Sequence, residues 1–182
     1  HGNGHPIIFI HSLGLDHNLW NFCIEELSAV TQTLTYDLPG HGINPSPKNP
    51  YKIENLSSDL IKALKKNNIS KASFVGLSIG GMIGQQLGAR YPERIYSLSL
   101  CNTASEMPPR SLWEERFEIA RTQGIAGLVD GTIKRWFTAP FIERAPGDIE
   151  KVRQMILDTN ADGYMGCGSA VRDMAQSTML LK

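Results

Sequence analysis

The residues best suited to chemistry lie in the stretch Gly76-Leu77-Ser78-Ile79-Gly80, which has the spacing Gly-x-Ser-x-Gly. A strand that turns into a helix through one residue forces that residue toward positive φ, and side chains two positions to either side would then collide. Ser78 would stand at the tip of this turn, with the N–H of Ile79 facing a developing oxyanion. The pattern predicts a serine nucleophile for acyl transfer; the alternative is a tight turn without chemistry.

A second group of candidates follows the apolar run at residues 6–10, in the loop His11-Ser12-Leu13-Gly14. A continuously apolar run indicates a strand covered on both faces of a parallel sheet, and loops at the carboxyl ends of such strands bind ligands. If this strand neighbours the Ser78 strand, the N–H of Leu13 becomes the second oxyanion donor. We assign Ser12 to substrate binding, and we interpret His11 as a residue that braces the loop, since the strand end points its ring away from Ser78.

The elements that must position these residues follow from hydrophobic periodicity. Strands are predicted at residues 6–10, 33–36, 72–77 and 94–101, and helices at 16–30, 53–67 and 79–90. Asp16 is the expected helix cap, and Asp37 is expected to tie down N–H groups in a Gly- and Pro-rich turn. Strands that alternate with helices through short joins predict an α/β fold with a doubly wound, mostly parallel sheet.

From Ser105 onward, helical periodicity dominates the chain. Helices are predicted at residues 112–122, 125–136, 149–160 and 163–181, with breaks at Gly124, Pro140, Pro146 and Gly147. A block of helices that follows a sheet strand is expected to cover the strand ends, where it excludes water and selects the substrate. We therefore divide the chain into an α/β core, residues 1–104, and a helical lid, residues 105–182.

Composition excludes several other classes of function. The 182 residues include 18 Lys and Arg and 18 Asp and Glu, so no overall field favours nucleic acid or an anionic membrane. Cys23, Cys101 and Cys167 are odd in number and widely spaced, which fits reduced thiols better than a disulfide framework. With no long apolar run and no leader, we expect a cytoplasmic protein that does not enter a membrane. A homo-oligomer is compatible with this composition.

The chain resembles the α/β-hydrolase superfamily through the segments at residues 11–14, 37–42 and 76–81. It further resembles the 3-oxoadipate enol-lactonases, which open an enol-lactone to 3-oxoadipate during the breakdown of aromatic compounds. The segments that carry this second resemblance are Asn102-Thr103, Arg135-Trp136-Phe137-Thr138, Thr159-Asn160, Gly163 to Cys167 and Ala170 to Asp173. The resemblance implies that Ser78 attacks a small carboxylated lactone and forms an acyl-enzyme, without any metal or organic cofactor.

A lactone with a free carboxylate requires a cation, and the fork geometry of arginine suits it better than lysine. Among the arginines of the expected lid, the candidates are Arg135, Arg153 and Arg172. Arg135 is our preferred carboxylate ligand because its neighbour Trp136 could cover an apolar ring face. The alternative is that these arginines form surface ion pairs of little energetic value.

The expected general base is missing from the chain. In the superfamily the order is Ser, then Asp or Glu, then His, yet His1, His5, His11, His17 and His41 all precede Ser78. We therefore expect a piece of a longer protein, trimmed at both ends, whose catalytic Asp and His lie beyond Lys182 and which has little activity alone. The open alternatives are a related carboxylesterase or carbon–carbon bond hydrolase, and a non-catalytic ligand-binding protein on the same fold.

Overall fold

A four-stranded parallel sheet forms the centre of the computed structural model, which describes residues 2–46, 50–107 and 109–176. The strand order is β2-β1-β3-β4. The strands are β1 His5–Ile10, β2 Thr31–Tyr36, β3 Ala72–Leu77 and β4 Ile95–Cys101. β1 pairs with β3, with Ile10 opposite Gly76, so the two loops with candidate residues leave the sheet side by side. The prediction that these two strands are neighbours is confirmed.

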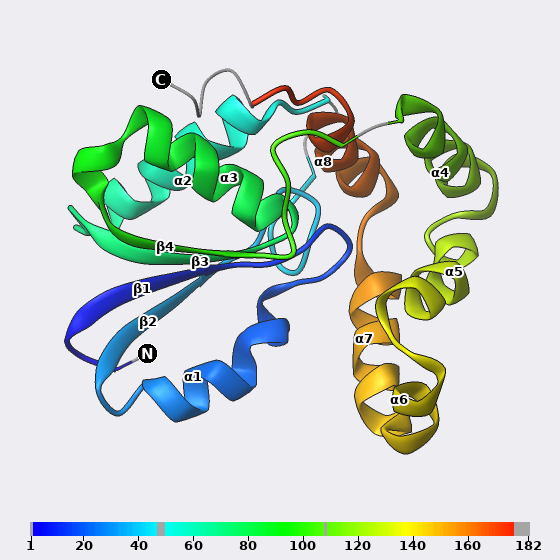
Figure 1. Ribbon diagram of the computed structural model, residues 1–182, viewed down its shortest axis with the longest axis horizontal. Coiled ribbons are helices and arrows are strands. Elements are labelled where there is room, and N and C mark those ends of the chain that lie inside the picture. Colours follow the sequence, from blue (N-terminus) through cyan, green and yellow to red (C-terminus); the bar gives the residue numbers. More distant parts are fainter. Residues whose placement is uncertain (1, 47–49, 108, 177–182) are drawn as a thin grey trace.

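Helices cover both faces of the sheet, as expected for a doubly wound fold (Figure 1). One face carries α2 Ile53–Lys66 and α3 Ile79–Arg90, and the other carries the 3₁₀ turn His17–Trp20 and α1 Asn21–Leu27. The apolar residues of β1 divide between two clusters: Ile8 and Ile10 pack under α2 and α3, whereas Phe9 packs against Trp20. This division explains why β1 is apolar without alternation.

The element at residues 16–30 differs from the single helix that was predicted. Asp16 caps it as expected, since its Oδ1 accepts a hydrogen bond of 2.8 Å from Asn18 N. The first turn is 3₁₀, however, and the α-helix ends at Leu27, while Val30 is exposed. β2 begins immediately afterwards at Thr31, so the strand includes Thr31 and Gln32, which lie before the predicted strand at residues 33–36.

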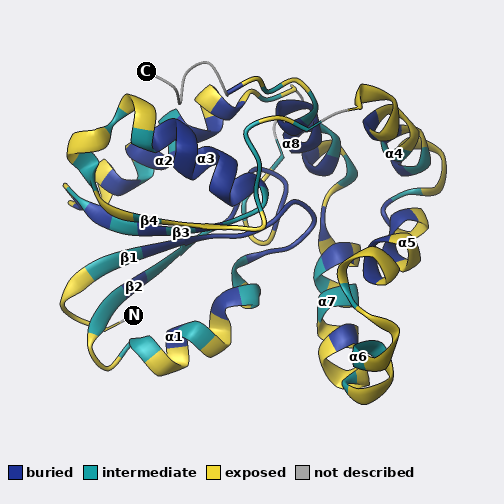
Figure 2. Cartoon of the chain, in the orientation of Figure 1, coloured by how far each residue is buried: buried dark blue, intermediate teal, exposed yellow. Residues whose placement is uncertain are grey.

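The remaining helices lie beyond the carboxyl ends of the strands (Figure 1). They are α4 Arg110–Gln123, α5 Ala126–Trp136, α6 Ala139–Arg144, α7 Pro146–Asp158 and α8 Ala161–Arg172. The helix α6 was not predicted, because Pro140 and Pro146 were interpreted as breaks. Both prolines instead stand in the first turn of a helix. The N–H groups of a first turn have no acceptor within the helix, so proline loses no hydrogen bond there. Figure 2 shows that α6 is mostly exposed, whereas α3 is buried along most of its length.

The predicted helix at 163–181 was too long within the described residues. α8 ends at Arg172, and the chain then turns toward the core, where Gln176 N donates to Ser105 O at 3.1 Å and Gln176 Nε2 donates to Met82 O at 3.2 Å. Tertiary hydrogen bonds thus replace the helix that local periodicity favoured. The part of this prediction that falls on residues 177–182 lies outside the described residues.

The helix α8 is attached closely to the core. Gly40 and Gly163 meet backbone to backbone: a Cβ on Gly40 would lie 2.4 Å from Gly163 Cα. Asn160 N donates to Gly40 O at 3.0 Å, and Tyr51 N donates to Gly166 O at 3.2 Å. One hydrophobic cluster runs from the sheet into α4, α5, α7 and α8. The boundary at residue 104 between core and lid stays a prediction.

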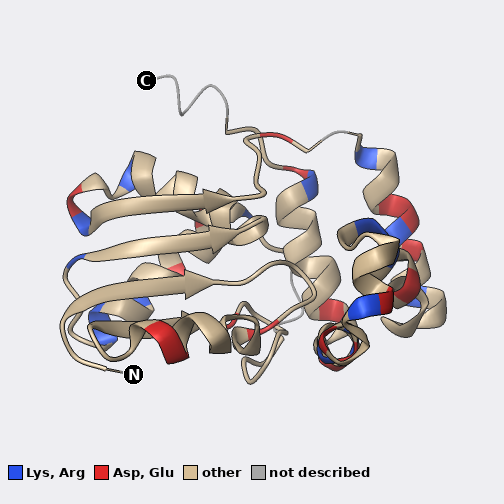
Figure 3. Ribbon diagram, turned by 60° about the horizontal axis from the view of Figure 1, so that its bottom comes forward, with Lys and Arg blue, Asp and Glu red and all other residues tan. Residues whose placement is uncertain are grey.

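Charged side chains gather on the helices, whereas the strands carry almost none (Figure 3). No helix in the described ranges has both the length and the apolar character needed to cross a membrane. Cys23, Cys101 and Cys167 are free thiols, and burial raises the pKa of Cys167 to about 12.

Candidate active site

The turn at Ser78 has the geometry that the sequence predicted. Ser78 joins β3 directly to α3, with φ 55° and ψ −115°. A Cβ on Gly76 would lie 2.3 Å from Gly80 O, and a Cβ on Gly80 would lie 2.3 Å from Ile10 O. Only glycine fits at these two positions, because any side chain would force the helix away from the strands.

Backbone hydrogen bonds hold the turn in place. Ser78 N donates to Cys101 O at 2.9 Å, which ties the turn to the end of β4. Ser78 O accepts from Thr103 Oγ1 at 2.7 Å and from Met82 N at 3.1 Å. No hydrogen bond within the described ranges uses the Ser78 hydroxyl, and the residue is only half-buried. The strained backbone is therefore fixed by its neighbours, while the side chain stays available to a ligand.

Ser78 lines a cavity of about 520 Å³ between the sheet and the lid helices. Three parts of the chain meet there: the loop after β1, the β3–α3 turn, and helices α4, α5, α7 and α8. The cavity brings together these predicted site residues: Ser12, Leu13, Ser78, Arg135 and Trp136. Ile79 does not line it; this residue is fully buried directly behind Ser78. The volume suits a small organic molecule.

Two backbone N–H groups are candidates for an oxyanion hole. Ile79 is the first residue of α3, so its N–H has no acceptor within the helix. Leu13 lines the cavity, and among the described residues no acceptor takes its N–H. Gly14, with φ 79°, sets the path of the loop. Their role as oxyanion donors stays a prediction.

Two buried histidines tie the loop after β1 to the loop after β2. His11 Nε2 accepts from Leu38 N at 3.0 Å, and His41 Nε2 accepts from Gly14 N at 3.1 Å. Each Nδ1–H then donates to a nearby carbonyl, Ser12 O for His11 and Pro39 O for His41. Both rings are therefore neutral with the proton on Nδ1. The interpretation of His11 as a brace is confirmed, and His41 forms a reciprocal brace that the sequence did not reveal.

Asp37 organises the same region. Its carboxylate accepts from His17 N and His17 Nδ1, both at 2.8 Å, and from Ile43 N at 3.2 Å. These bonds bear out the prediction that Asp37 ties down N–H groups. Its Oδ1 lies 3.7 Å from His11 Nε2, and Asp16 and His17 also act electrostatically on His11.

We expect this histidine pair to make the fold sensitive to acid. Burial lowers the pKa of His41 from 6.5 to about 3 and also lowers the pKa of His11. The unfolded chain therefore takes up protons below pH 6.5 while the folded chain does not, so stability is complete above pH 6.5 and falls as the pH decreases toward 3. For His41 alone the loss between pH 7 and pH 5 should be about 2 kcal/mol.

The variant His41→Gln provides the test, because glutamine can accept from Gly14 N but does not titrate. Urea unfolding at pH 7 and pH 5 should show a smaller acid loss in His41→Gln than in the wild type. His5→Gln, at an exposed histidine, is the matched control for the substitution itself. Equal acid losses in the wild type and in His41→Gln would contradict the assignment.

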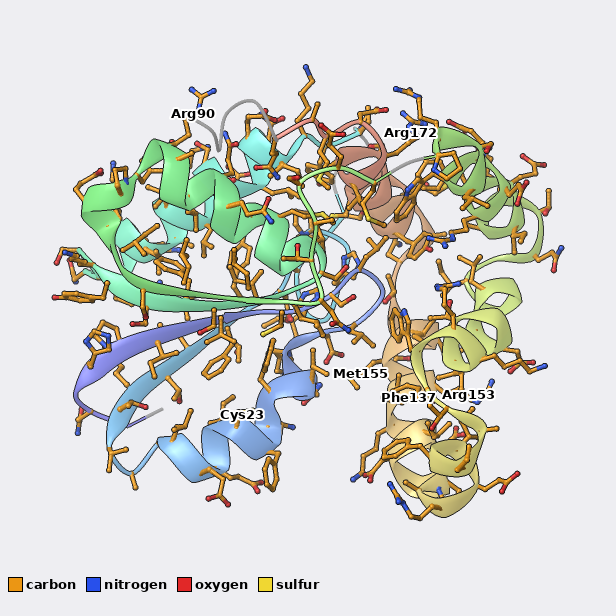
Figure 4. The ribbon with its side chains drawn as sticks, in the orientation of Figure 1. Cys23, Arg90, Phe137, Arg153, Met155 and Arg172 are labelled. Carbon is orange, nitrogen blue, oxygen red and sulfur yellow. The ribbon has the colours of Figure 1, made fainter. Side chains whose placement is uncertain are left out.

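The three lid arginines considered as carboxylate ligands, Arg135, Arg153 and Arg172, fall into two groups. Arg153 contacts Asp130 at 2.7 Å and Glu150 at 3.6 Å, and Arg172 contacts Glu114 and Asp173, each at 2.6 Å. Figure 4 labels both arginines, Arg153 on α7 and Arg172 on α8. The guanidinium groups hold the pKa of Asp130 and of Asp173 below the ordinary range. Arg153 and Arg172 therefore fit the alternative of surface ion pairs.

Arg135 differs, because no carboxylate in the described part of the chain lies within salt-bridge distance of it. Its one hydrogen bond there runs from Nη2 to Thr132 Oγ1 at 3.3 Å. Burial and then the neighbouring charge of Arg116 lower the pKa of Arg135. The cavity thus contains a cation without a counterion, and Trp136 is also at its wall.

Several cavity residues were not singled out from the sequence: Trp113, Arg116, Phe137 and Tyr164. Arg116 lies on α4, where an arginine on an otherwise charged helix gives no local signal. Phe137 and Tyr164 stand in segments that carried the family resemblance, and that resemblance was the one available pointer to them.

No histidine lines the cavity among the described residues. His11, His17 and His41 are engaged elsewhere, and His5 lies at the opposite end of β1. Across the described ranges no cluster of His, Cys, Asp or Glu could hold a metal ion. A base for Ser78 is therefore not identified in this part of the chain.

The strand, sharp turn and helix at Ser78, together with helices on both sheet faces, define an α/β protein with the elbow on which such proteins carry a nucleophile. The chain belongs to the alpha/beta hydrolase fold family, whose sequence model matches residues 5–144.

Known relatives extend this similarity beyond the elbow. The chain is 34% identical over 167 residues to 3-oxoadipate enol-lactonase 2 of Acinetobacter baylyi, covering 92% of this chain and 62% of the relative. It is 37% identical to the enol-lactonase structure from Burkholderia xenovorans LB400, with a TM-score of 0.92, covering 96% of this chain and 67% of the other. A thermophilic esterase structure from Thermogutta terrifontis is 26% identical, with a TM-score of 0.91, covering 97% and 66%. The resemblance to enol-lactonases is confirmed, and the chain spans about three fifths of that curated relative's length.

Proposed function

We propose that this chain carries the nucleophile and substrate pocket of a serine hydrolase that opens a small carboxylated enol-lactone, 3-oxoadipate enol-lactone, to 3-oxoadipate. The observation that carries the proposal is the shared cavity of Ser78, at the tip of the elbow, and Arg135, a cation without a counterion. The similarity to enol-lactonases supports the choice of substrate. Such an enzyme would act in the cytoplasm, in the breakdown of aromatic compounds.

The proposed reaction has two stages. Ser78 Oγ loses its proton to a base and attacks the lactone carbonyl, and the N–H groups of Leu13 and Ile79 receive the oxyanion. The bond from the carbonyl carbon to the ring oxygen breaks, the departing enolate oxygen takes up the proton held by the base, and the resulting enol converts to the ketone. Water then attacks the acyl-enzyme and releases the new carboxylate. We infer that the base is a histidine outside residues 1–182, oriented by an acidic residue that also lies outside them.

The lid helices have two roles in this proposal. Their apolar side chains, Trp113, Leu128 and Ile156 among them, shield the bound substrate from bulk water while leaving room for the hydrolytic water. Arg135 binds the substrate carboxylate with Trp136 against the ring, and Ser12 contacts the lactone from the loop after β1. With the carboxylate held at Arg135, the distance between Arg135 and Ser78 decides which ester bond of the substrate reaches the Ser78 hydroxyl.

A carboxylesterase is the second candidate, because much of the cavity wall is apolar and would accept an uncharged ester. The similarity to the thermophilic esterase supports this candidate. Comparing turnover of the enol-lactone with turnover of aryl esters of similar size separates the two. Absence of any turnover in the full-length protein, with retained ligand binding, would favour a non-catalytic binding protein.

We expect Arg135→Ala to discriminate between charged and uncharged substrates. Hydrogen bonds to charged groups contribute about 1.5–3 kcal/mol, so kcat/KM for the carboxylated lactone should fall roughly 10- to 100-fold. An uncharged aryl ester should lose less than about twofold, since it offers no partner to the guanidinium. Arg153→Ala is the control, because Arg153 already pairs with the carboxylates of Asp130 and Glu150. Equal losses on both substrates would remove Arg135 from carboxylate binding.

A further inference from the structure

Two guanidinium groups, not one, line the cavity. Arg116 on α4 joins Arg135 on α5 in its wall. Four of the five other lid arginines have acidic partners within 4 Å, namely Arg110, Arg121, Arg153 and Arg172, and the fifth, Arg144, lies over the Phe141 ring. In the described part of the chain neither Arg116 nor Arg135 has such a partner. The wall of the pocket therefore carries two positive charges that no carboxylate in the described part of the chain neutralises.

Packing fixes the position of Arg116. Its Cζ lies 4.8 Å from the centre of the Trp113 ring, and Trp113 is buried. A guanidinium that stacks on an indole contacts the ring through its flat face. Its N–H groups point outward in the guanidinium plane and therefore remain available to an acceptor. No hydrogen bond among the described residues uses them. Arg116 is thus held in place by an aromatic face rather than by an anion.

The two arginines and Tyr164 form one electrostatic cluster. The charge of Arg116 contributes to the lowered pKa of Arg135. Burial raises the pKa of Tyr164, whereas the charges of Arg116 and Arg135 both act in the opposite direction. The ring of Tyr164 lies beside the oxyanion loop: a Cβ on Gly14 would be 3.7 Å from Tyr164 Cε2. The cluster therefore adjoins the loop that carries Leu13.

Two like charges near an apolar wall repel each other. A carboxylate has about four acceptor sites on two oxygens and can accept from two guanidinium groups at once. Its entry would relieve the repulsion and supply the missing counterion. A neutral ester would do neither, so the pair selects by charge.

We propose that Arg116 and Arg135 form a paired anion subsite that binds a single ligand carboxylate jointly, with the Tyr164 hydroxyl as a neighbouring donor. Arg116 is then a second specificity-determining residue, and the ligand class is a short aliphatic acid whose other end reaches Ser78. The identity of that ligand as the lactone rests on the function proposed above. The anion subsite itself does not, since it can be measured by binding alone.

Calorimetric titration of the full-length protein with monomethyl adipate, which has one carboxylate, and with dimethyl adipate, which has none, tests the pair. Arg116→Gln and Arg135→Gln should each weaken monomethyl adipate binding roughly 10- to 100-fold and change dimethyl adipate binding less than about twofold. Their double variant should lose less than the product of the two single losses, because both act on one carboxylate. Arg153→Gln is the matched control and should bind both probes as the wild type does.

Different outcomes separate this inference from the proposed function. Normal monomethyl adipate binding in Arg116→Gln, with weakened binding in Arg135→Gln, would overturn the pair and leave the hydrolase proposal intact. Losses that multiply in the double variant would show that the two arginines act independently and would also overturn joint binding. Arg116→Lys keeps the charge but not the fork, so intermediate binding in that variant would support the pair and exclude misfolding as the cause. Loss of turnover in Ser78→Ala tests the hydrolase proposal independently of all these measurements.

Discussion

Replacing Ser78 by alanine is expected to reduce kcat of the full-length protein on the enol-lactone by roughly 10⁴- to 10⁶-fold. The reason is that the hydroxyl is the sole nucleophile in the proposed mechanism, and without it only the oxyanion donors and substrate positioning remain. The binding of monomethyl adipate should change less than about twofold, because the anion subsite is built from lid residues. Steady-state kinetics and calorimetry on the same preparation would measure both quantities.

Ser97 offers a matched control for this substitution. It is an exposed serine on β4 whose hydroxyl donates to Ser73 Oγ at 2.8 Å, and it does not line the cavity. Ser97→Ala should retain essentially full turnover. If Ser78→Ala kept more than a few per cent of the wild-type rate, the elbow would be a structural turn and the acyl-enzyme mechanism would have to be abandoned.

The parts of the fold that could be predicted from sequence are those where one local pattern decides. β3 and α3 begin and end at the predicted residues, because Ser78 separates a strand from a helix and the flanking glycines permit the close backbone contacts that this turn requires. α6 and the end of α8 could not be predicted in the same way. A proline such as Pro140 is compatible both with a break between helices and with the first turn of a helix. Gln176 donates hydrogen bonds to the carbonyl groups of Ser105 and Met82, which are distant in sequence, so the chain leaves the helix before it.

The residues of the candidate site also differ in whether a local sequence pattern identifies them. Ser78, Leu13 and Arg135 were found because each stands in a short segment with a recognisable pattern. Arg116 and His41 were not, because what matters for each is a neighbour on another element: Arg135 on α5 for Arg116, and Gly14, 27 residues earlier, for His41. A pattern along one helix or loop carries no information on such pairs.

Replacing Gly80 by alanine is expected to lower the free energy of unfolding by at least about 3 kcal/mol. A Cβ at this position would lie 2.3 Å from Ile10 O and 2.9 Å from Ile10 C, and these are backbone atoms of the central strand that cannot rotate away. Relief requires α3 to move off β1, which would also displace Ile79 N–H from Ser78. Urea unfolding should therefore show a lower midpoint, and any folded fraction should have reduced turnover.

Gly131→Ala provides the opposite expectation with the same chemical change. Gly131 lies within α5, and a Cβ there would meet nothing within 4 Å. Alanine at an open helical position should stabilise the protein by about 0.5–1 kcal/mol, since it restricts the unfolded chain without a clash. The two substitutions should thus shift the unfolding midpoint in opposite directions.

A loss of less than about 1 kcal/mol in the free energy of unfolding of Gly80→Ala would mean that α3 can move away from β1 at little cost. The close contact between helix and strand would then not be what fixes the elbow, and the glycine spacing that first indicated a nucleophile would lose its steric explanation.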